Sequence, residues 1–327
     1  MRFTTEVTIA PEIPRKWLKD RRSPLVVIVG PTGSGKSDLA VSLAEVLRGE
    51  IVNFDSVQLY RGLDVGSAKL QIAERRGIPH HMIDVAEPAI ELTAGAYARM
   101  ARPLLRQIAA TGAIPILVGG TGFYLRALLD GLSPAPQRDE ALRLRLADLA
   151  RRRPKILHRY LSYWDGAAAG RIHPNDHQKL IRAIELMRLA GRRASEVQDQ
   201  PRERLEGFAV YKIGLAPDRC ALYERINRRT VAMFERGLVD ETEALLRAGV
   251  PSSSKALRSL GYRQALQYLR GDLSREAAVA ECQLRTRQYA KRQLTWFRAD
   301  TEVAWLPGFG TDSRVRTAAV EKCRQIV

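Results

Sequence analysis

The sequence predicts an α/β protein in which a parallel sheet carries helices on both faces and an all-helical segment is inserted into the chain. Short apolar runs at 25–29, 51–56, 114–118 and 208–213 have the β-branched composition of strands that are buried on both faces. Helical patterns alternate with these runs, which is typical of a parallel sheet. Strand signals disappear between 139 and 193, where only arginine-rich helical patterns occur.

The first strand leads directly into a glycine-rich loop at 30–37, GPTGSGKS, which fits the phosphate-binding pattern G-x-x-x-x-G-K-[ST]. A helix follows at once, so the loop lies at a positive helix terminus. The loop therefore predicts a core like that of the P-loop NTPases, in which backbone N–H groups surround a phosphate, Lys36 contributes charge and the Ser37 hydroxyl binds Mg2+. The phosphate-binding residues that we expect are Gly30, Thr32, Gly33, Ser34, Gly35, Lys36 and Ser37.

The second strand, 51–56, is predicted to end on Asp55. In open α/β sheets ligands bind at the carboxyl ends of the strands, so this carboxylate is expected to point at the phosphate site. Asp55 is either an acid that holds Mg2+ through water or a general base that acts on a second substrate, and the sequence leaves both roles open. The polar segment 58–69 is predicted to be a loop over the site.

The strand at 114–118 also ends in a glycine-rich turn, 119–122, and a helix at 123–129 follows. This repetition places Thr121 at the same end of the sheet as the phosphate loop, where its hydroxyl is suited to bind phosphate or an incoming nucleophile. Between these strands we expect a short third strand at 80–84 and a helix at 93–111 with Thr93 as its N-cap. His80 and His81 have no further metal ligand nearby and are interpreted as structural.

The helical insertion begins where proline becomes frequent, near 132–136, and strand signals resume at 208–213. His173 and His177 have the i, i+4 spacing of metal ligands on a helix. Asn175 or Asp176, however, is better explained as the N-cap of a helix that starts there. The predicted organisation is an N-terminal extension (1–23), a first core segment (24–131), a helical insertion that contacts RNA (132–200) and a mostly helical second core segment (201–327).

The last third predicts helices at 218–237, 254–270 and 274–298. In the longest of them Arg285, Tyr289, Arg292 and Trp296 fall on one stripe. Five basic residues and no acidic one lie between 283 and 298. Alternating cations and rings suit single-stranded nucleic acid, whereas the alternative is that the rings cover the core and the arginine stems cover the rings.

Composition points in the same direction, because 53 Lys and Arg residues against 36 Asp and Glu residues give a net charge of +17. Such an excess favours a polyanionic partner, either nucleic acid or an acidic membrane surface. No apolar run is long enough to cross a bilayer, and 1–23 does not have the pattern of a secretory signal. The three cysteines are far apart in no redox or metal spacing. We therefore expect a cytoplasmic protein that does not associate with membranes.

The motifs together resemble those of the tRNA dimethylallyltransferase family, also called tRNA isopentenyltransferases or IPP transferases. The similar segments are spread over nearly the whole chain: GPTGSGKS (30–37), NFDSVQLYRGLDVGSAK (53–69), PHHMID (79–84), ILVGGTGFYLRALLDGLSP (116–134), RIHPNDHQKLIRAIE (171–185), LRSLGYRQ (257–264) and RTRQYAKRQLTWFR (285–298). Departures are conservative: Gly33 stands where alanine is usual, and Ser37 and Ser67 stand where threonine is common.

The resemblance implies that the loop holds dimethylallyl diphosphate with Mg2+ at Ser37, and that the product is N6-isopentenyladenosine next to the anticodon of tRNA. It assigns Asp55 as general base, Thr121 as the residue that orients the amine or the diphosphate, and Arg229 as a further diphosphate contact. The residues that it implies for contact with the anticodon stem-loop are Asp55, Ser56, Val57, Gln58, Thr121, Arg143, Gln178, Lys179, Leu180, Ile181, Arg182, Arg258, Gly261, Tyr262, Arg263, Arg285, Tyr289, Lys291, Arg292, Gln293, Trp296 and Arg298.

Two other functions are compatible with the loop. A P-loop kinase of a nucleotide or small metabolite would use Asp55 as its metal-linked acid and would consume ATP. A non-enzymatic RNA-binding ATPase would depend on the basic helix and would not require Asp55. In each case we expect a monomer.

Overall fold

The computed structural model describes residues 22–324. Two compact units divide the chain: one combines the residues up to 128 with those from 205 onward, and the other spans 129–204. Residues 1–21, which make up most of the predicted N-terminal extension, lie outside the described residues. Each unit is described by itself below.

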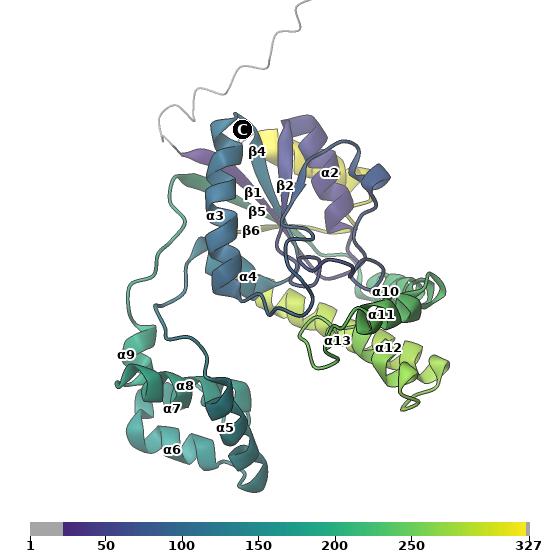
Figure 1. Cartoon of the computed structure of the whole chain (residues 1–327). Coiled ribbons are helices and arrows are strands. Elements are labelled where there is room, and N and C mark those ends of the chain that lie inside the picture. The colour runs from purple at the N-terminus through teal and green to yellow at the C-terminus, as the bar shows by residue number, and fades with distance from the viewer. Residues whose placement is uncertain (1–21, 325–327) are drawn as a thin grey trace, which may run out of the picture. The chain divides into compact units, whose positions relative to one another are not determined.

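The first unit contains a six-stranded, entirely parallel sheet with the strand order β3-β2-β4-β1-β5-β6 (Figure 1). This arrangement confirms the predicted α/β fold with a P-loop-like core. β1 lies between β4 and β5, so the loop that follows it opens near the middle of the sheet. The strands are β1 (Ser23–Val29), β2 (Gly49–Asn53), β3 (His80–His81), β4 (Ile114–Val118), β5 (Phe208–Leu215) and β6 (Val303–Leu306).

Helices cover both faces of this sheet. Alternate residues of each strand point to opposite sides, so an apolar strand has apolar side chains to bury on both faces. Val26 and Ile28 of β1 belong to an apolar core with α2 (Lys36–Leu47) and α14 (Ser313–Arg324). On the other face lies α3 (Ala94–Ala110), whose Tyr97 hydroxyl donates to the backbone oxygen of Asn53 over 3.0 Å. β1 and β4 are therefore buried on both sides, as their continuous apolar composition predicts.

Helix termini follow the local signals of the sequence. The Thr93 side chain accepts a hydrogen bond from the N–H of Ala96 and caps α3. Asp176 likewise accepts from the N–H of Lys179 and caps α8 (His177–Ala190). Both N-caps are confirmed, and Asp176, rather than a metal site, explains the segment around His173.

The last third of the chain differs from the prediction in several elements. The helix expected at 254–270 is wrong for its first half, because turns occupy 252–261 and only α12 (Tyr262–Leu269) is helical. α11 (Leu238–Arg247), β6 and α14 were not predicted. The remaining helices are α4 (Gly122–Leu129), α10 (Arg219–Glu235) and α13 (Arg275–Arg298), and a 3-10 turn spans Ile72–Arg75.

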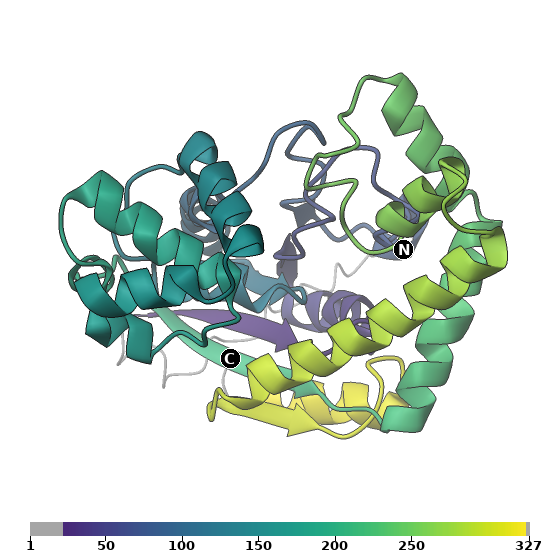
Figure 2. The ribbon, with the colours of Figure 1, turned by 90° about the horizontal axis from the view of Figure 1, so that it is seen from below.

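α10 and α13 pack against each other and cross at an angle in the view of Figure 2. Asn227 of α10 joins them, because its side-chain oxygen accepts from Arg287 and its backbone oxygen accepts from Gln283. α11 and α12 complete a second apolar core with α13 and with Tyr60 and Leu63 of the loop that follows β2. This packing brings the basic helix α13 to the carboxyl ends of the strands.

The second unit is helical and has a core of its own. Its helices are α5 (Glu140–Arg152), α6 (Ile156–Trp164), α7 (Gly166–Gly170), α8 and α9 (Ala194–Gln198). Glu185 of α8 is fully buried and accepts from Arg143, Arg182 and the N–H of Asp139. This cluster ties the start of α5 to α8.

Candidate active site

The phosphate loop connects β1 to α2 and is held from behind by the segment after β6. Gly33 and Gly35 both have φ of +82°, a left-handed conformation that favours glycine. The N–H of Gly310 donates to the backbone oxygen of Ser34 over 2.8 Å, and a Cβ on Gly35 would lie 3.1 Å from the nitrogen of Gly310. Glycine on both segments therefore allows the close contact that fixes the loop.

Lys36 is the first residue of α2 and lines the cavity beside the loop. Its ammonium donates to the backbone oxygen of Pro31 over 2.8 Å. Burial lowers the pKa of Lys36 to about 8, with a further lowering by Arg229 and an opposing effect of the Asp55 carboxylate. The loop thus presents a cation whose charge state changes near pH 8.

Arg229 of α10 reaches the loop from the far end of the sequence and donates from Nη2 to the Thr32 hydroxyl over 2.6 Å. Burial lowers the pKa of its guanidinium, and the neighbouring Arg225 acts in the same direction. Arg225 and Arg228 of the same helix, and Arg236 directly after its end, line the same cavity. The structure therefore brings Arg229 to the predicted phosphate site and adds three arginines that the sequence did not single out.

Two cavities meet at this place. The larger, about 580 Å³, is lined by the loop, by the segment 64–71 and by the arginines of α10. The smaller, about 300 Å³, is lined by residues 55–57 and by residues of α10, α13 and the turn before α12. The residues that line both are Thr32, Asp55, Ser67, Arg229 and Met233. Asp55 therefore borders both cavities.

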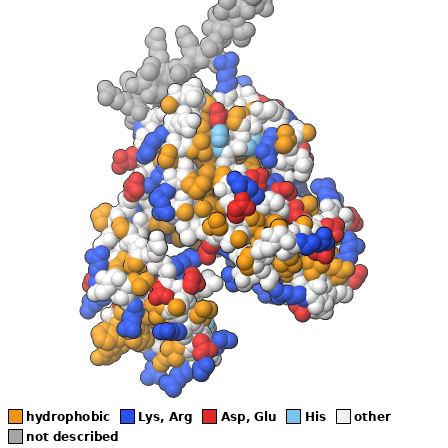
Figure 3. Space-filling view, viewed as in Figure 1, with side chains coloured by type: hydrophobic (Ala, Val, Ile, Leu, Met, Phe, Trp, Pro, Cys, Tyr) orange, Lys and Arg blue, Asp and Glu red, His pale blue; other side chains and the backbone are white. Residues whose placement is uncertain are grey.

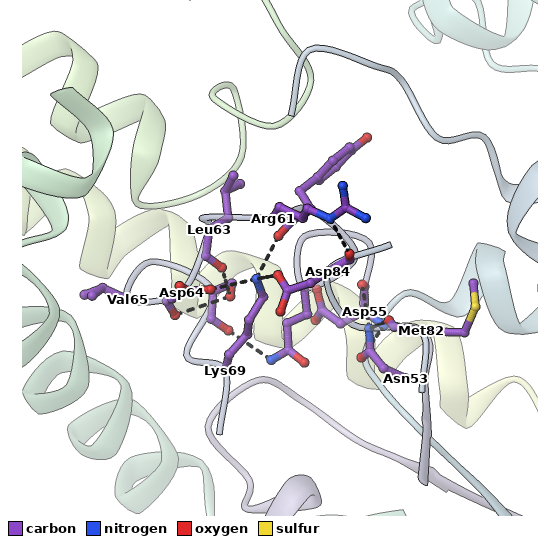
Figure 4. A network of polar contacts seen from close by, with 12 residues as sticks. Asn53, Asp55, Arg61, Leu63, Asp64, Val65, Lys69, Met82 and Asp84 are labelled. Atoms are coloured by element: carbon purple, nitrogen blue, oxygen red, sulfur yellow. Dashed lines mark hydrogen bonds and ion pairs between the residues drawn. The ribbon is translucent and has the colours of Figure 1, made fainter. Parts of the chain in front are cut away.

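Asp55 lies two residues beyond the end of β2, not on the strand as predicted. Its Oδ1 accepts from the N–H of Val57 over 2.9 Å. The buried side chain of Asn53 accepts from the N–H of Asp55 and donates to the backbone oxygens of Asp55 and Met82 (Figure 4). Backbone hydrogen bonds thus hold the carboxylate at the junction of the two cavities.

Thr121 supports Asp55 indirectly. Its hydroxyl oxygen accepts from the N–H of Ser56 over 3.0 Å and lies 3.2 Å from the Ser56 hydroxyl. Thr121 does not line either of the two cavities described above. Tyr289 of α13 lies beside it, and burial together with the charge of Asp55 raises the pKa of this phenol. The geometry places Thr121 where it positions the segment after Asp55.

The loop at 57–69 is held by two charged side chains. Lys69 is almost fully buried and donates to Tyr60, Asp64 and Asp84 (Figure 4). The Glu241 carboxylate of α11 accepts the N–H groups of residues 64, 65 and 66 and also the Tyr262 hydroxyl. These contacts shape the wall that the loop contributes to both cavities.

Comparison with known proteins identifies the chain. A family model described as IPP transferase matches residues 58–300. The chain belongs to the IPP transferase family. A second model, Isopentenyl transferase, matches residues 23–91, which include the phosphate loop.

Two relatives match this chain over nearly their whole length. A tRNA dimethylallyltransferase of Koribacter versatilis is 54% identical over 302 residues, which cover 91% of this chain and 97% of the relative. The enzyme of that name from Solibacter usitatus is 50% identical over 299 residues, which cover 91% of this chain and 97% of the relative. The match therefore extends across both units of the chain.

Solved structures agree in fold. The full-length tRNA isopentenylpyrophosphate transferase of Bacillus halodurans is 36% identical with a TM-score of 0.70, covering 93% of this chain and 96% of that one. A eukaryotic dimethylallyltransferase, crystallised acting on tRNA, is 26% identical with a TM-score of 0.76 and covers 93% and 80% of the two chains.

Within this member of the family, the predicted phosphate residues are not equivalent. Thr32, Gly33, Gly35, Lys36 and Ser37 line the larger cavity. Gly30 packs against Leu215 of β5, and Ser34 is fully buried with its hydroxyl unpaired among the described residues. These two residues shape the loop from behind.

Apart from Thr121, the predicted RNA-contacting residues separate into three groups. The first lines the two cavities: Asp55, Ser56, Val57, Gln58, Arg258, Gly261, Tyr289 and Arg292. The second is exposed: Gln178, Lys179, Arg263, Arg285, Lys291, Trp296 and Arg298. The third has buried or internally paired side chains: Arg143 and Arg182 at Glu185, Tyr262 at Glu241, and Leu180, Ile181 and Gln293. For this third group, side-chain contact with RNA would require the internal partners to be released.

The stripe of arginines and rings on α13 was interpreted either as an RNA-binding face or as rings covered by arginine stems, and the structure has features of both. The Arg292 guanidinium lies 5.8 Å from the centre of the half-buried Tyr289 ring, whereas Trp296 is 46% exposed. Across the face seen in Figure 3, Lys and Arg side chains are scattered and do not form one patch. The positive charge therefore does not mark a single site on this face.

Magnesium would find few protein ligands here. Among residues 22–324 no group of three or more His, Cys, Asp or Glu side chains is arranged to hold a metal. The Ser37 hydroxyl and the Asp55 carboxylate both line the larger cavity. Mg2+ usually keeps several waters and is bound through one or two protein groups plus substrate phosphates, so this sparse donor set fits it.

In the part of the chain that the structure describes, no helix has the length and apolar character needed to span a membrane.

Proposed function

We propose that this protein transfers the dimethylallyl group of dimethylallyl diphosphate to N6 of the adenosine immediately 3′ of the anticodon in tRNA, with release of diphosphate. The relatives named above support this proposal. The observation that carries it in the structure is that Asp55 and Arg229 line both the cationic cavity of the phosphate loop and the second cavity. One carboxylate thus lies within reach of two substrates.

The cationic cavity suits the diphosphate. Lys36, Arg229 and the loop N–H groups face the position of a leaving group whose negative charge grows as the allylic C–O bond breaks. Fixed donors of this kind stabilise the charge that develops in the transition state. Arg225, Arg228 and Arg236 extend the positive region along α10 toward solvent and would attract the anionic substrate.

Mg2+ would be held by the Ser37 hydroxyl together with the diphosphate oxygens. When bound, it would neutralise part of the leaving-group charge.

Asp55 acts on the acceptor. The exocyclic amine of adenine is a poor nucleophile, because its lone pair is delocalised into the ring. As the bond from N6 to the allylic carbon forms, the proton of N6 passes to Asp55, which contributes about 10²- to 10⁴-fold in rate. Thr121 supports this step through its hydrogen bond to Ser56, next to Asp55.

The adenine must leave its stack to reach Asp55, as in other enzymes that modify bases. The smaller cavity, which is lined by Arg258, Tyr289 and Arg292, would receive it. The exposed Lys291, Trp296 and Arg298 and the exposed Gln178 and Lys179 would contact the anticodon stem-loop. We further propose action in the cytoplasm, where tRNA is processed, and as a monomer, since residues of one chain line both cavities.

Mass spectrometry of nucleosides tests the proposal. Unmodified tRNA incubated with the protein, Mg2+ and dimethylallyl diphosphate is expected to gain one isopentenyl group on adenosine. Turnover of ATP without this gain would instead support a P-loop kinase or an RNA-binding ATPase and would refute the proposal.

The role of Asp55 is tested separately. Asp55→Asn should lower the rate of transfer about 10²- to 10⁴-fold while tRNA binding is kept. Asp272→Asn, an exposed change of the same kind outside both cavities, is the matched control and should leave the rate unchanged. Full activity of Asp55→Asn would exclude Asp55 as the base.

A further inference from the structure

We propose that Gln293 is a positioning residue that links the RNA-facing helix α13 to the diphosphate-binding loop, so that binding of RNA strengthens binding of the prenyl diphosphate. The inference rests on the proposed function. In the sequence, Gln293 was predicted only as a residue that contacts RNA.

Gln293 is buried, with 4% of the residue exposed, and both ends of its amide are used. Oε1 accepts from the backbone N–H of Thr32 over 2.7 Å. Nε2 donates to the backbone oxygen of Gly120 over 2.8 Å. One side chain of α13 therefore joins the loop after β1 to the loop after β4.

The glycine-rich turn after β4 is shaped for this contact. A Cβ on Gly120 would lie 2.0 Å from Nε2 of Gln293, and a Cβ on Gly122 would lie 2.2 Å from Nε1 of Trp296. Glycine at these positions allows α13 to approach the backbone. The turn at 119–122 thus serves helix packing.

Thr32 is held from two sides. Gln293 binds its N–H, and Arg229 binds its hydroxyl. Thr32 lines both cavities, so a displacement of this residue alters the diphosphate site directly. Arg292 and Trp296 lie near Gln293 on α13 and are exposed. RNA bound to them would restrain the helix that carries the amide.

The coupling follows from this arrangement. If bound RNA restrains α13, the position of Thr32 is already restricted. Less conformational entropy is then lost when the diphosphate binds, so the prenyl diphosphate binds more tightly. By linkage, the prenyl diphosphate must raise the RNA affinity by the same factor.

The experiment uses the full chain, the unreactive thiolodiphosphate analogue of dimethylallyl diphosphate and an anticodon stem-loop. Calorimetry gives the analogue affinity with and without RNA, and hydrogen exchange follows the Thr32 amide. In Gln293→Met, which keeps the length but removes both hydrogen bonds, we expect analogue affinity to fall about tenfold, as for the loss of hydrogen bonds worth about 1.4 kcal/mol. The coupling factor should approach one, RNA affinity without analogue should change by less than about twofold, and RNA should no longer slow exchange at Thr32.

Two further variants separate positioning from simple loss of structure. Gln293→Glu keeps an acceptor for the Thr32 N–H and should restore much of the analogue affinity. Gly120→Ala forces Gln293 aside and should reproduce the Gln293→Met behaviour. The matched controls are Gln288→Met, an exposed change on α13, and Gly166→Ala, where a Cβ meets nothing within 4 Å.

The outcomes are distinguishable. Equal analogue affinity and equal coupling in wild type and Gln293→Met would overturn the inference. So would an equal fall in both affinities accompanied by a lower melting temperature, because that pattern indicates a purely structural side chain. A wild-type protein that binds neither analogue nor RNA would instead contradict the proposed function.

Discussion

Binding of the diphosphate should be accompanied by uptake of a proton at Lys36. Burial lowers the pKa of this ammonium from 10.5 to about 8, and a bound diphosphate would raise it again because the negative charge favours the protonated form. Near pH 8 about half of the Lys36 side chains are neutral, so binding should take up about 0.5 proton per site, falling to about 0.1 at pH 7 and rising to about 0.9 at pH 9.

Calorimetry in two buffers of different ionisation enthalpy measures this uptake with the thiolodiphosphate analogue. Lys36→Arg is the matched control, because a guanidinium stays protonated throughout this range and only the titration of the ligand remains. The difference between wild type and Lys36→Arg should increase from pH 7 to pH 9. Equal proton uptake by the two proteins at pH 8 and 9 would refute the assignment of Lys36 as the titrating diphosphate contact.

The other predictions concern the elements that hold the site and the insertion. Glu241→Ala should leave three backbone N–H groups and the Tyr262 hydroxyl without their acceptor, and should lower the free energy of unfolding by about 2–4 kcal/mol. Hydrogen exchange at residues 64–66 should accelerate, and unchanged protection there would contradict this role. Glu185→Ala should lower the free energy of unfolding of the helical insertion by about 2–4 kcal/mol, because it removes the shared partner of Arg143 and Arg182. Hydrogen exchange in α5 and α8 during chemical denaturation measures it, and a stability equal to wild type would show that the buried cluster is dispensable.

Much of the site could be predicted because its signals are local. A buried strand, a glycine-rich loop and a helix follow one another at 25–47, and the backbone conformation of that unit is set by residues adjacent in the chain. Asp55 was found for a related reason, because the carboxyl ends of parallel strands meet at one edge of a sheet. Thr93 and Asp176 were found because an N-cap acts within three residues.

Other parts were missed because they depend on contacts between distant segments. α11, β6 and α14 carry no motif, and their apolar residues pack against distant segments of the first unit. Nothing in the sequence around Glu241 indicates that its carboxylate accepts the N–H groups of a loop about 175 residues earlier. Arg143 and Arg182 read as cations free for RNA until Glu185 is seen between them.

The sequence by itself determined the class of fold, the phosphate loop and the family, because each depends on residues a few positions apart or on segments compared one by one. Only the tertiary structure decided how these parts act together. Thr32 and Gln293 are 261 residues apart, and no periodicity or motif relates them. Their hydrogen bond exists because the sheet presents both glycine-rich loops at one edge and α13 packs across that edge, where a buried amide must find partners for its oxygen and its nitrogen.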